Sequence, residues 1–468
     1  MHIFLFHRDL RIHDNTALIH QMKSIPRGEN VIPIFIFTPE QINPRINDYF
    51  SNNSVQFMIE SLMDLSAQIR EKDGVLRFFY GDTMTVLRQI HSAHKISSIA
   101  YNLDYTPYAK SRDAAIETWC KKIGAQLYTK EDYALHDILT GETTKPSDKT
   151  PYQIFTPFKN HCSGRKIREP DPFRAFRFSG GGLISDIKSA ISTHDFSRFY
   201  KPNTHINVHG GRKNALKILA KMGKFDEYNT RRDILTYKTT FLSAHNHFTT
   251  VSIREVYYSI VAKLGARTKL INELYWRDFY MNITHYFPHV LRGRAFKSQY
   301  NSIPWSKNRA HFEKWCDGKT GFPLIDAAQN QLRETGFMHN RARMCSAMFL
   351  TKDLHISWKW GEKFFAQHLV DYSPMQNNGG WQWASSTGTD AQPYFRVFNP
   401  WTQSAEYDPK CEYIKTWIPE LHDVPPRDIL NWWREDVRAK YPDVLEKYRE
   451  PMIDHDHERK KAISQFQK

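Results

Sequence analysis

The sequence of 468 residues predicts an α/β half with a doubly wound parallel sheet (Rossmann-like), followed by an all-α half. Two observations predict this architecture. Up to about residue 130, short apolar runs alternate with stretches of helical periodicity, which is typical of a parallel sheet covered by helices. From about residue 205 onward the strand patterns fade and helical patterns dominate. A chain of this length can support two or three domains with their own cores.

Four apolar runs, at 3–6, 31–37, 76–80 and 98–101, predict the strands of the sheet. Between them, 54–71 and 108–123 carry apolar residues at helical spacing. No glycine-rich dinucleotide fingerprint follows the first run, so an ordinary NAD-dependent enzyme has weak support.

Composition divides the chain into three expected segments. Residues 1–130 form the α/β domain and 205–468 the helical domain. Residues 131–204 are rich in proline, glycine, lysine and serine, including Ser179-Gly180-Gly181-Gly182, and we expect a linker that runs over the surface. The charged stretch that begins at Asp454 is expected to be a solvated tail.

Charge and cysteine usage bound the class of protein. Lysine and arginine outnumber aspartate and glutamate by 65 to 50, which favours a polyanionic partner but also fits a merely soluble basic protein. The five cysteines lie far apart without a Cys-x-x-Cys pair, which argues against a disulfide framework or a metal site. No apolar run approaches a membrane span. We expect a soluble intracellular monomer, in cytoplasm or nucleus, without a metal and without a membrane partner.

The most distinctive stretch runs from Asn377 to Asp390 and contains adjacent glycines, two tryptophans and small hydroxyl residues. Such a backbone can approach a flat aromatic ligand closely. Taken alone, the stretch indicates only a close-packed aromatic site, since a tryptophan pair is more often plain core.

Two helical faces carry candidate chemistry. Glu273, Trp276 and Arg277 are spaced i, i+3 and i+4 and so share one face, and Asn340 shares a face with Met344. Without further information, the first face also fits a surface salt bridge beside a packed tryptophan, and the second an ordinary amphipathic helix.

Together these strings resemble the photolyase and cryptochrome family, most closely the class I cyclobutane pyrimidine dimer photolyases. The resemblance rests on 377–400, 273–280, 318–328 and the helix that begins at Met338, in the family's order. It covers nearly the whole helical half and is looser in the first half. It implies an antenna-type α/β domain, an FAD-binding catalytic domain and the cofactor FAD.

The resemblance also implies which residues hold FAD. These are Tyr228, Thr239, Thr240, Leu242, Ser243, Glu273, Arg277, Asn340, Arg343, Asp371, Ser373 and Asn377. Ser373 departs from the family, which usually has aspartate there. Residues 241–250 also depart, because the family usually has a Lys/Arg-Phe-Gly step.

Three positions indicate the reaction. Asn377 is expected to face the reactive flavin nitrogen, where a neutral amide stabilises the anionic reduced state and the aspartate usual in plant cryptochromes would repel it. Asn340 and Met344 stand where relatives that repair (6-4) photoproducts place histidines. A cyclobutane dimer needs an electron but no general acid, so these residues favour dimer repair by a carbon–carbon lyase. Glu273 is expected to hydrogen-bond the base edge of the dimer.

The expected partner is DNA that contains pyrimidine dimers, single or double stranded, bound without sequence preference after the dimer flips out of the helix. Trp276 and Trp383 are expected to form stacking walls for the flipped bases. The resemblance places Glu273, Asn340, Arg232, Arg341 and Arg396 at the DNA, the three arginines at phosphates.

Trp305, Trp358 and Trp381 match the family's tryptophan chain, which carries electrons from the surface to oxidised flavin. Residues 102–107 follow the fourth strand, at the sheet edge where α/β proteins bind ligands. Similar proteins hold a folate or deazaflavin antenna there. Arg292 stands where some folate-using members have lysine, so the antenna is left open.

Two other functions remain as alternatives. A cryptochrome-type blue-light photoreceptor would bind FAD but signal through protein partners, and Asn377 argues against it. A non-photochemical nucleotide-binding enzyme on the first sheet would leave the helical half unexplained.

Overall fold

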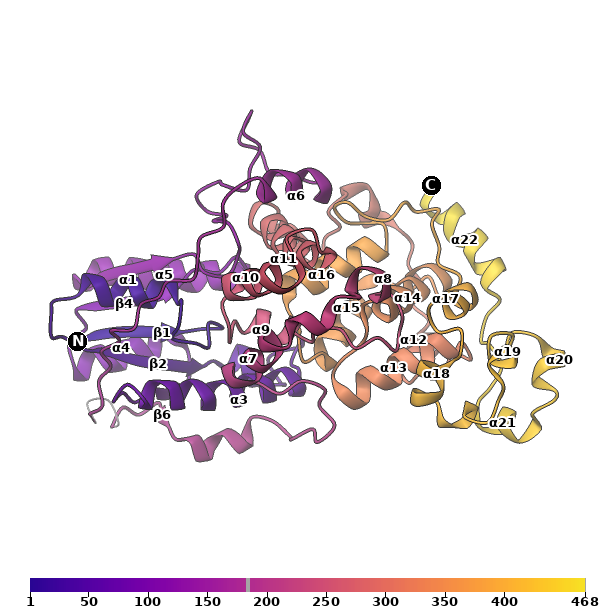
Figure 1. The fold of residues 1–468 in the computed structure, drawn as a ribbon, viewed down its shortest axis with the longest axis horizontal. Helices are drawn as coiled ribbons and strands as arrows, with labels where there is room; N and C mark the ends of the chain where they lie inside the picture. Colours follow the sequence, from indigo (N-terminus) through magenta and orange to yellow (C-terminus); the bar gives the residue numbers. More distant parts are fainter. Residues whose placement is uncertain (182–185, 468) are drawn as a thin grey trace.

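The computed structural model describes residues 1–181 and 186–467 and combines a six-stranded sheet with a large helical body (Figure 1). The strands are β1 (His2–Phe6), β2 (Val31–Phe37), β3 (Arg77–Tyr80), β4 (Ser98–Asn102), β5 (Gln126–Lys130) and β6 (Ala190–Ile191). Their order is β5-β4-β1-β2-β3-β6, and every neighbouring pair is parallel except β3 with β6. The sheet winds outward in both directions from β1, which confirms the predicted α/β fold.

Helices cover both faces of the sheet. Phe4 and Phe6 of β1 enter a core with α1 (Thr16–Ser24) and α3 (Asn52–Arg70). Ile3 and Leu5 point the other way, toward α4 (Thr83–Ala93) and α5 (Pro107–Ile123). All residues of β1, β2 and β4 are buried, which explains why these strands read as continuous apolar runs.

The second half is helical, as predicted, and its helices enclose two large apolar cores (Figure 1). The helices longer than one turn that position the site or the chain end are α7 (Arg212–Ala220), α10 (Ile253–Leu264), α11 (Lys269–Tyr286), α12 (Arg309–Cys316), α13 (Pro323–Thr335), α14 (Asn340–Met348), α15 (Trp358–His368), α16 (Pro374–Ala384), α17 (Pro400–Tyr407) and α22 (His455–Gln467). Shorter elements include α8 (Tyr228–Arg231), α9 (Ser243–His247) and the π-helix η5 (Phe349–Asp353).

The expected surface linker is largely internal in its first part, so that expectation is wrong there. The side chains of Tyr133, Ile138 and Phe158 are fully buried, and α6 (Phe155–Ser163) packs into the core formed by α10 and α11. A proline- and glycine-rich composition is typical of loops, but it does not say whether the loop is covered. Gly182 of the glycine run lies outside the described residues, and the domain boundaries at 130 and 204 stay a prediction.

The expectation of a solvated C-terminal tail is also wrong. Residues 455–467 form α22, whose His455, Ala462 and Phe466 are buried against η5. His455 Nδ1 lies 2.5 Å from Asp353 Oδ1, and the Phe466 ring lies 3.4 Å from Lys352 Nζ. Burial of Lys352 lowers its pKa to about 7. His455, Ala462 and Phe466 are spaced on one helix face, but the many charged residues between them hid this pattern in the sequence.

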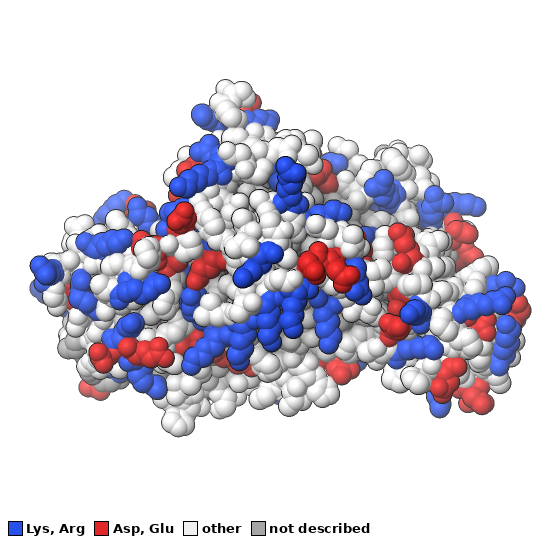
Figure 2. All heavy atoms as spheres, in the orientation of Figure 1, with Lys and Arg blue, Asp and Glu red and all other residues white. Residues whose placement is uncertain are grey.

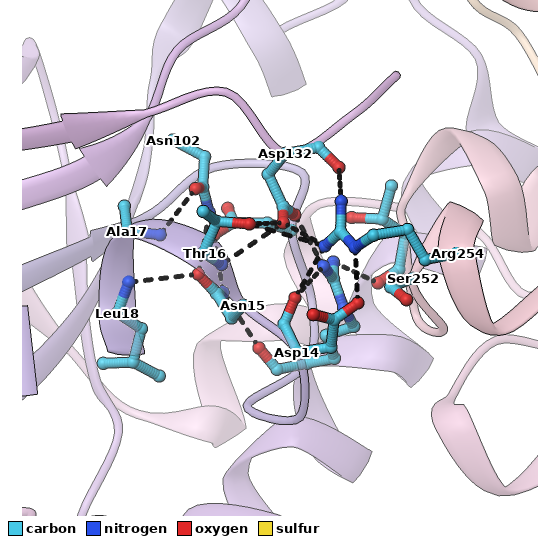
Figure 3. A network of polar contacts seen from close by, with 12 residues as sticks. Asp14, Asn15, Thr16, Ala17, Leu18, Asn102, Asp132, Ser252 and Arg254 are labelled. Carbon is cyan, nitrogen blue, oxygen red and sulfur yellow. Dashed lines mark hydrogen bonds and ion pairs between the residues drawn. The ribbon is translucent and has the colours of Figure 1, made fainter. Parts of the chain in front are cut away.

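A buried network of charges joins the two halves (Figure 3). Asp132, just after β5, accepts from Arg11 Nη2 at 2.6 Å and from Arg254 Nη2 of α10 at 2.8 Å. Arg254 Nε also donates to Asp14 Oδ2 at 2.6 Å. Burial alone would raise the pKa of Asp132, but the charges of Arg11 and Arg254 outweigh it and hold that pKa below its ordinary value. The fold thus fixes the helical half to the carboxyl edge of the sheet by buried ion pairs.

Candidate functional site

The α11 helix carries the first group of candidate residues. Its N-cap Thr268 accepts from the backbone N–H of Leu270, and the helix then presents Glu273, Trp276 and Arg277 on one face. Glu273 Oε1 accepts from Arg232 Nη1 at 2.7 Å. Burial raises the pKa of Glu273, and the Arg232 charge opposes that shift.

Arg277, on the same face, is held by two hydrogen bonds from its guanidinium group. Its Nη1 donates to Asp278 Oδ1 at 2.8 Å and its Nη2 donates to the carbonyl of Asn246 at 3.3 Å. Gln376 Nε2 of α16 donates to the Arg277 carbonyl at 2.8 Å, so α11 is tied to α16 at this point.

Helix α14 supplies the second predicted face, and the structure brings its two residues together. Asn340 Nδ2 lies 3.7 Å from the Met344 sulfur. Arg343 of the same helix donates from Nη2 to Asp371 Oδ2 at 2.9 Å and from Nε to the carbonyl of Met338 at 2.8 Å. A half-exposed guanidinium beside a nearly buried carboxylate can hold the polar groups of a nucleotide cofactor.

Asn377 on α16 has a fixed amide. Its Nδ2 donates to the carbonyl of Glu362 at 2.9 Å, and this bond sets the direction of Oδ1. The adjacent backbone is close to Tyr280: a Cβ on Gly379 would lie 2.1 Å from that ring, so glycine is required there.

The predicted phosphate-binding turn precedes α9. Thr239, Thr240 and Ser243 are partly or fully exposed, while Leu242 is buried. Phe241 between them has a φ of 53°, and Thr240 Oγ1 accepts from the N–H of Leu242 at 3.3 Å. Tyr228 of α8, eleven residues before Thr239, is buried and hydrogen-bonds Arg232.

Ser373 is the least available of the predicted cofactor residues. It is buried at the N-terminus of α16, and its hydroxyl donates to Gln376 Oε1. This internal bond gives the serine at that position a role in holding α16.

The described residues fit a flavin nucleotide in their chemistry. Hydroxyl, guanidinium and amide groups are present in the predicted places. Three buried polar atoms have no protein partner and lie within four residues along the chain of a predicted cofactor residue: Tyr237 Oη, Asn246 Oδ1 and Trp381 Nε1. Buried polar atoms normally have a partner, so these three favour a bound polar ligand. The sequence reading missed Tyr237 and Asn246, because neither belongs to a recognisable string.

The three predicted phosphate-binding arginines differ in availability. Arg232 is bonded to Glu273, and Arg341 pairs with Asp233 at 2.9 Å while its guanidinium lies 4.2 Å from the Tyr407 ring centroid. Arg396 is exposed, and its neighbour Phe395 is 57% exposed. The geometry therefore favours Arg396 for a direct contact, while Arg232 and Arg341 shape the site from within.

Positive charge gathers on the face shown in Figure 2, where Lys and Arg form a band in the region that Figure 1 assigns to α7. Lys213, Lys217, Lys221 and Lys224 are exposed there. Along the chain, these lysines come shortly before α8 and Arg232.

The three predicted chain tryptophans lie on neighbouring elements. Trp358 of α15 and Trp381 of α16 are buried, and a Cβ on Gly361 would lie 2.1 Å from the Trp381 ring, so these two helices pack tightly at that point. Trp305 is half-buried, and Ser306 N beside it donates to the carbonyl of His355, three residues before Trp358. Phe466 of α22 lies edge-on to Trp305 at 6.1 Å.

The expected antenna residues are mostly engaged in internal bonds. Asn102 Nδ2 donates to Asp9 Oδ2, and Asp104 pairs with Arg8 at 2.6 Å. Both ring nitrogens of His7 and the hydroxyl of Tyr133 are buried without partners at the same edge of the sheet. Burial also holds the pKa of His7 well below its ordinary value, so the ring is neutral. Arg292 is exposed at the end of a short helix and gives no indication of the chromophore.

Within 1–181 and 186–467, no cluster of three His, Cys, Asp or Glu residues has the arrangement of a metal site. No helix in that part of the chain combines the length and apolar character needed to cross a membrane.

A parallel α/β sheet docked on a helical body with a polar, nucleotide-compatible site defines a two-part cofactor-binding protein. Two family models match the chain: DNA photolyase over residues 2–175, and the FAD binding domain of DNA photolyase over residues 270–468. The chain belongs to the DNA photolyase family.

Individual relatives agree with the family match. The deoxyribodipyrimidine photo-lyase of Alkalihalophilus pseudofirmus is 34% identical over 98% of this chain and 96% of its own length. That of Escherichia coli is 32% identical over 100% of this chain and 98% of its own.

Solved structures agree in fold. An archaeal photolyase from Sulfolobus tokodaii, which holds two FAD molecules, is 35% identical with a TM-score of 0.87 and covers 100% of this chain and 99% of its own. A Synechocystis cryptochrome is 22% identical with a TM-score of 0.87, covering 99% of this chain and 98% of its own, and shares the fold.

Proposed function

We propose that this protein repairs cyclobutane pyrimidine dimers in DNA with light, as a carbon–carbon lyase that uses FAD. Two features together carry the proposal. Asn377 presents a neutral amide held by a hydrogen bond, and Asn340 and Met344 form a face of α14 without a titratable side chain. Near-complete coverage by relatives named deoxyribodipyrimidine photo-lyase supports the same reaction.

FAD would be held by the turn at Thr239–Ser243, by Arg277 and by Arg343 with Asp371. When bound and reduced, it supplies under illumination the electron that enters the dimer and takes it back after the bonds break. The two carbon–carbon bonds that join the pyrimidines break, and no atom or proton is gained or lost. A proton donor at Asn340 or Met344 is therefore unnecessary.

The other residues bind and orient the dimer. Arg232 fixes the direction of the Glu273 carboxyl group, which is placed to hydrogen-bond the base edge of the dimer. Trp276 and Trp383 supply stacking surfaces. Arg396 and the lysine band bind phosphates without reading sequence, and exposed Phe395 offers an apolar group to the gap left by the flipped bases.

Repair is expected only in light. The reduced protein is incubated with dimer-containing oligothymidylate in blue light and in darkness, and restored thymines are measured by absorbance. Restoration in light alone supports the proposal. Photoreduction of the flavin without restoration would contradict it and favour the cryptochrome-type alternative.

Replacing Trp305 by phenylalanine is expected to slow photoreduction of oxidised flavin by at least about tenfold, because phenylalanine is far harder to oxidise than tryptophan. Repair by protein that was reduced chemically beforehand should stay near the wild-type rate. Photoreduction is measured by the loss of flavin absorbance under blue light. Loss of both activities would contradict the electron-transfer role of Trp305.

We also infer that a second chromophore binds at the carboxyl edge of the sheet, near His7, Asp104 and Tyr133. The unpaired ring nitrogens of His7 and the unpaired hydroxyl of Tyr133 support a polar ligand there. Its type, folate, deazaflavin or flavin, is to be identified by denaturing the purified protein and separating the released chromophores. Release of a single FAD per chain and nothing else would contradict this inference.

A further inference from the structure

The start of α6 touches one of the proposed stacking walls. The rings of Phe155 and Trp276 are stacked with their centroids 3.7 Å apart and their planes 6° from parallel. Phe155 is 8% exposed, whereas Trp276 stays partly open. One face of the indole is therefore covered by Phe155.

The same short segment also holds the turn that follows α16. The N–H of Phe155 donates to Asp390 Oδ2 at 3.1 Å, and Thr389 Oγ1 donates to the carbonyl of Gln153 at 2.6 Å. Asp390 has a φ of 43°, a conformation that a non-glycine residue adopts only when its surroundings impose it.

That turn leads directly back to the second stacking wall. The N–H of Gln392 donates to the carbonyl of Trp383 at 3.3 Å, so the turn closes onto the end of α16. Residues 153–155 thus contact the Trp276 ring on one side and the chain that leaves Trp383 on the other.

We infer that Phe155 is a positioning residue for dimer binding, which fixes Trp276 so that its open face meets the flipped base at a set distance from Trp383. This inference rests on the proposed function. Close packing of Phe155 against one ring face restricts the rotamers open to Trp276, so Trp276 is ordered before the substrate arrives. Pre-ordering a binding group lowers the entropy lost on binding, which raises affinity without changing the chemical step.

Three variants test the inference. Phe155→Leu keeps the apolar volume but removes the aromatic face, and Phe155→Tyr keeps that face. Phe158→Leu is the matched control, since Phe158 lies on the same helix, is fully buried and contacts Phe279 at 5.3 Å rather than Trp276. Each protein is checked for bound FAD. Binding of dimer-containing oligothymidylate is then measured in darkness, and repair is measured at saturating substrate in light.

Phe155→Leu is expected to raise the dissociation constant about five- to tenfold, with repair at saturation unchanged. Phe155→Tyr and Phe158→Leu should bind like wild type. Thr389→Val removes the hydroxyl bond to Gln153 and keeps a side chain of similar shape at this buried position. It should weaken binding in the same direction, and it replaces Phe155→Leu if that variant loses FAD.

Wild-type affinity in both Phe155→Leu and Thr389→Val would overturn the positioning role while leaving the proposed function intact. An equal loss in Phe158→Leu would also overturn it, because the effect would then belong to the helix as a whole. If the wild-type protein neither binds nor repairs the oligonucleotide, the proposed function fails and this inference fails with it.

Discussion

Replacing Asp132 by alanine is expected to destabilise the protein by about 3–5 kcal/mol, because it leaves two buried guanidinium groups without their shared carboxylate. Arg11 loses its carboxylate partner, and Arg254 keeps only Asp14 in the junction between the halves. The measurement is denaturant unfolding of wild type and variant at pH 7, followed by circular dichroism and by flavin release.

The control is Asp48→Ala, which breaks an ion pair with Lys363 at the surface and is expected to cost about 1 kcal/mol or less. The pH dependence has a definite sign. Because the pKa of Asp132 is depressed in the fold, its contribution is present above the ordinary aspartate pKa and is lost as the pH falls. The difference between wild type and Asp132→Ala should therefore shrink in acid. A difference that is small at pH 7 would show that the junction is not held by these charges.

Replacing Asn377 by aspartate is expected to reduce light-driven repair at least about tenfold while FAD stays bound. A carboxylate next to an anionic reduced flavin costs on the order of 1–3 kcal/mol of like-charge repulsion, and every 1.4 kcal/mol is about a factor of ten. The substitution also removes the amide N–H that donates to the Glu362 carbonyl, so two oxygens would face each other there.

Repair is measured at fixed light intensity on protein reduced chemically, with FAD content and dark DNA binding as controls. Both controls should stay close to wild type, since Asn377 and aspartate have nearly the same size and the exposed Arg396 and lysine band are unchanged. Wild-type repair by Asn377→Asp would contradict the role given to the amide.

The main features of the fold could be predicted because local signals agreed with tertiary structure. The runs that became β1 to β4 are apolar since helices cover both faces of the sheet, and α3 and α5 have long helical stripes. β5 was missed because Gln126–Lys130 is a polar edge strand with partly exposed side chains. β6 has only two residues and pairs antiparallel at the other edge.

The candidate site was predicted mainly from sequence motifs that resemble the family, and less from helical spacing and residue chemistry. Helical spacing alone placed Glu273 with Trp276, and Asn340 with Met344, and the structure agrees with both pairs. Spacing could not reveal that Arg232 bonds Glu273, since the two lie 41 residues apart in the chain. Phe155 was missed because it stands at the start of a segment whose composition resembles a linker.

The charged junction has a bearing on how the chain is made. Arg11, Asp14 and Asp132 leave the ribosome well before Arg254, which comes 122 residues after Asp132. During synthesis, Asp14 and Asp132 therefore lack Arg254 for the time needed to translate the intervening segment. That time is roughly 6–25 s at about 5–20 residues per second. A nascent α/β half is expected to mature only when α10 emerges, so premature termination before that helix should yield aggregation-prone fragments.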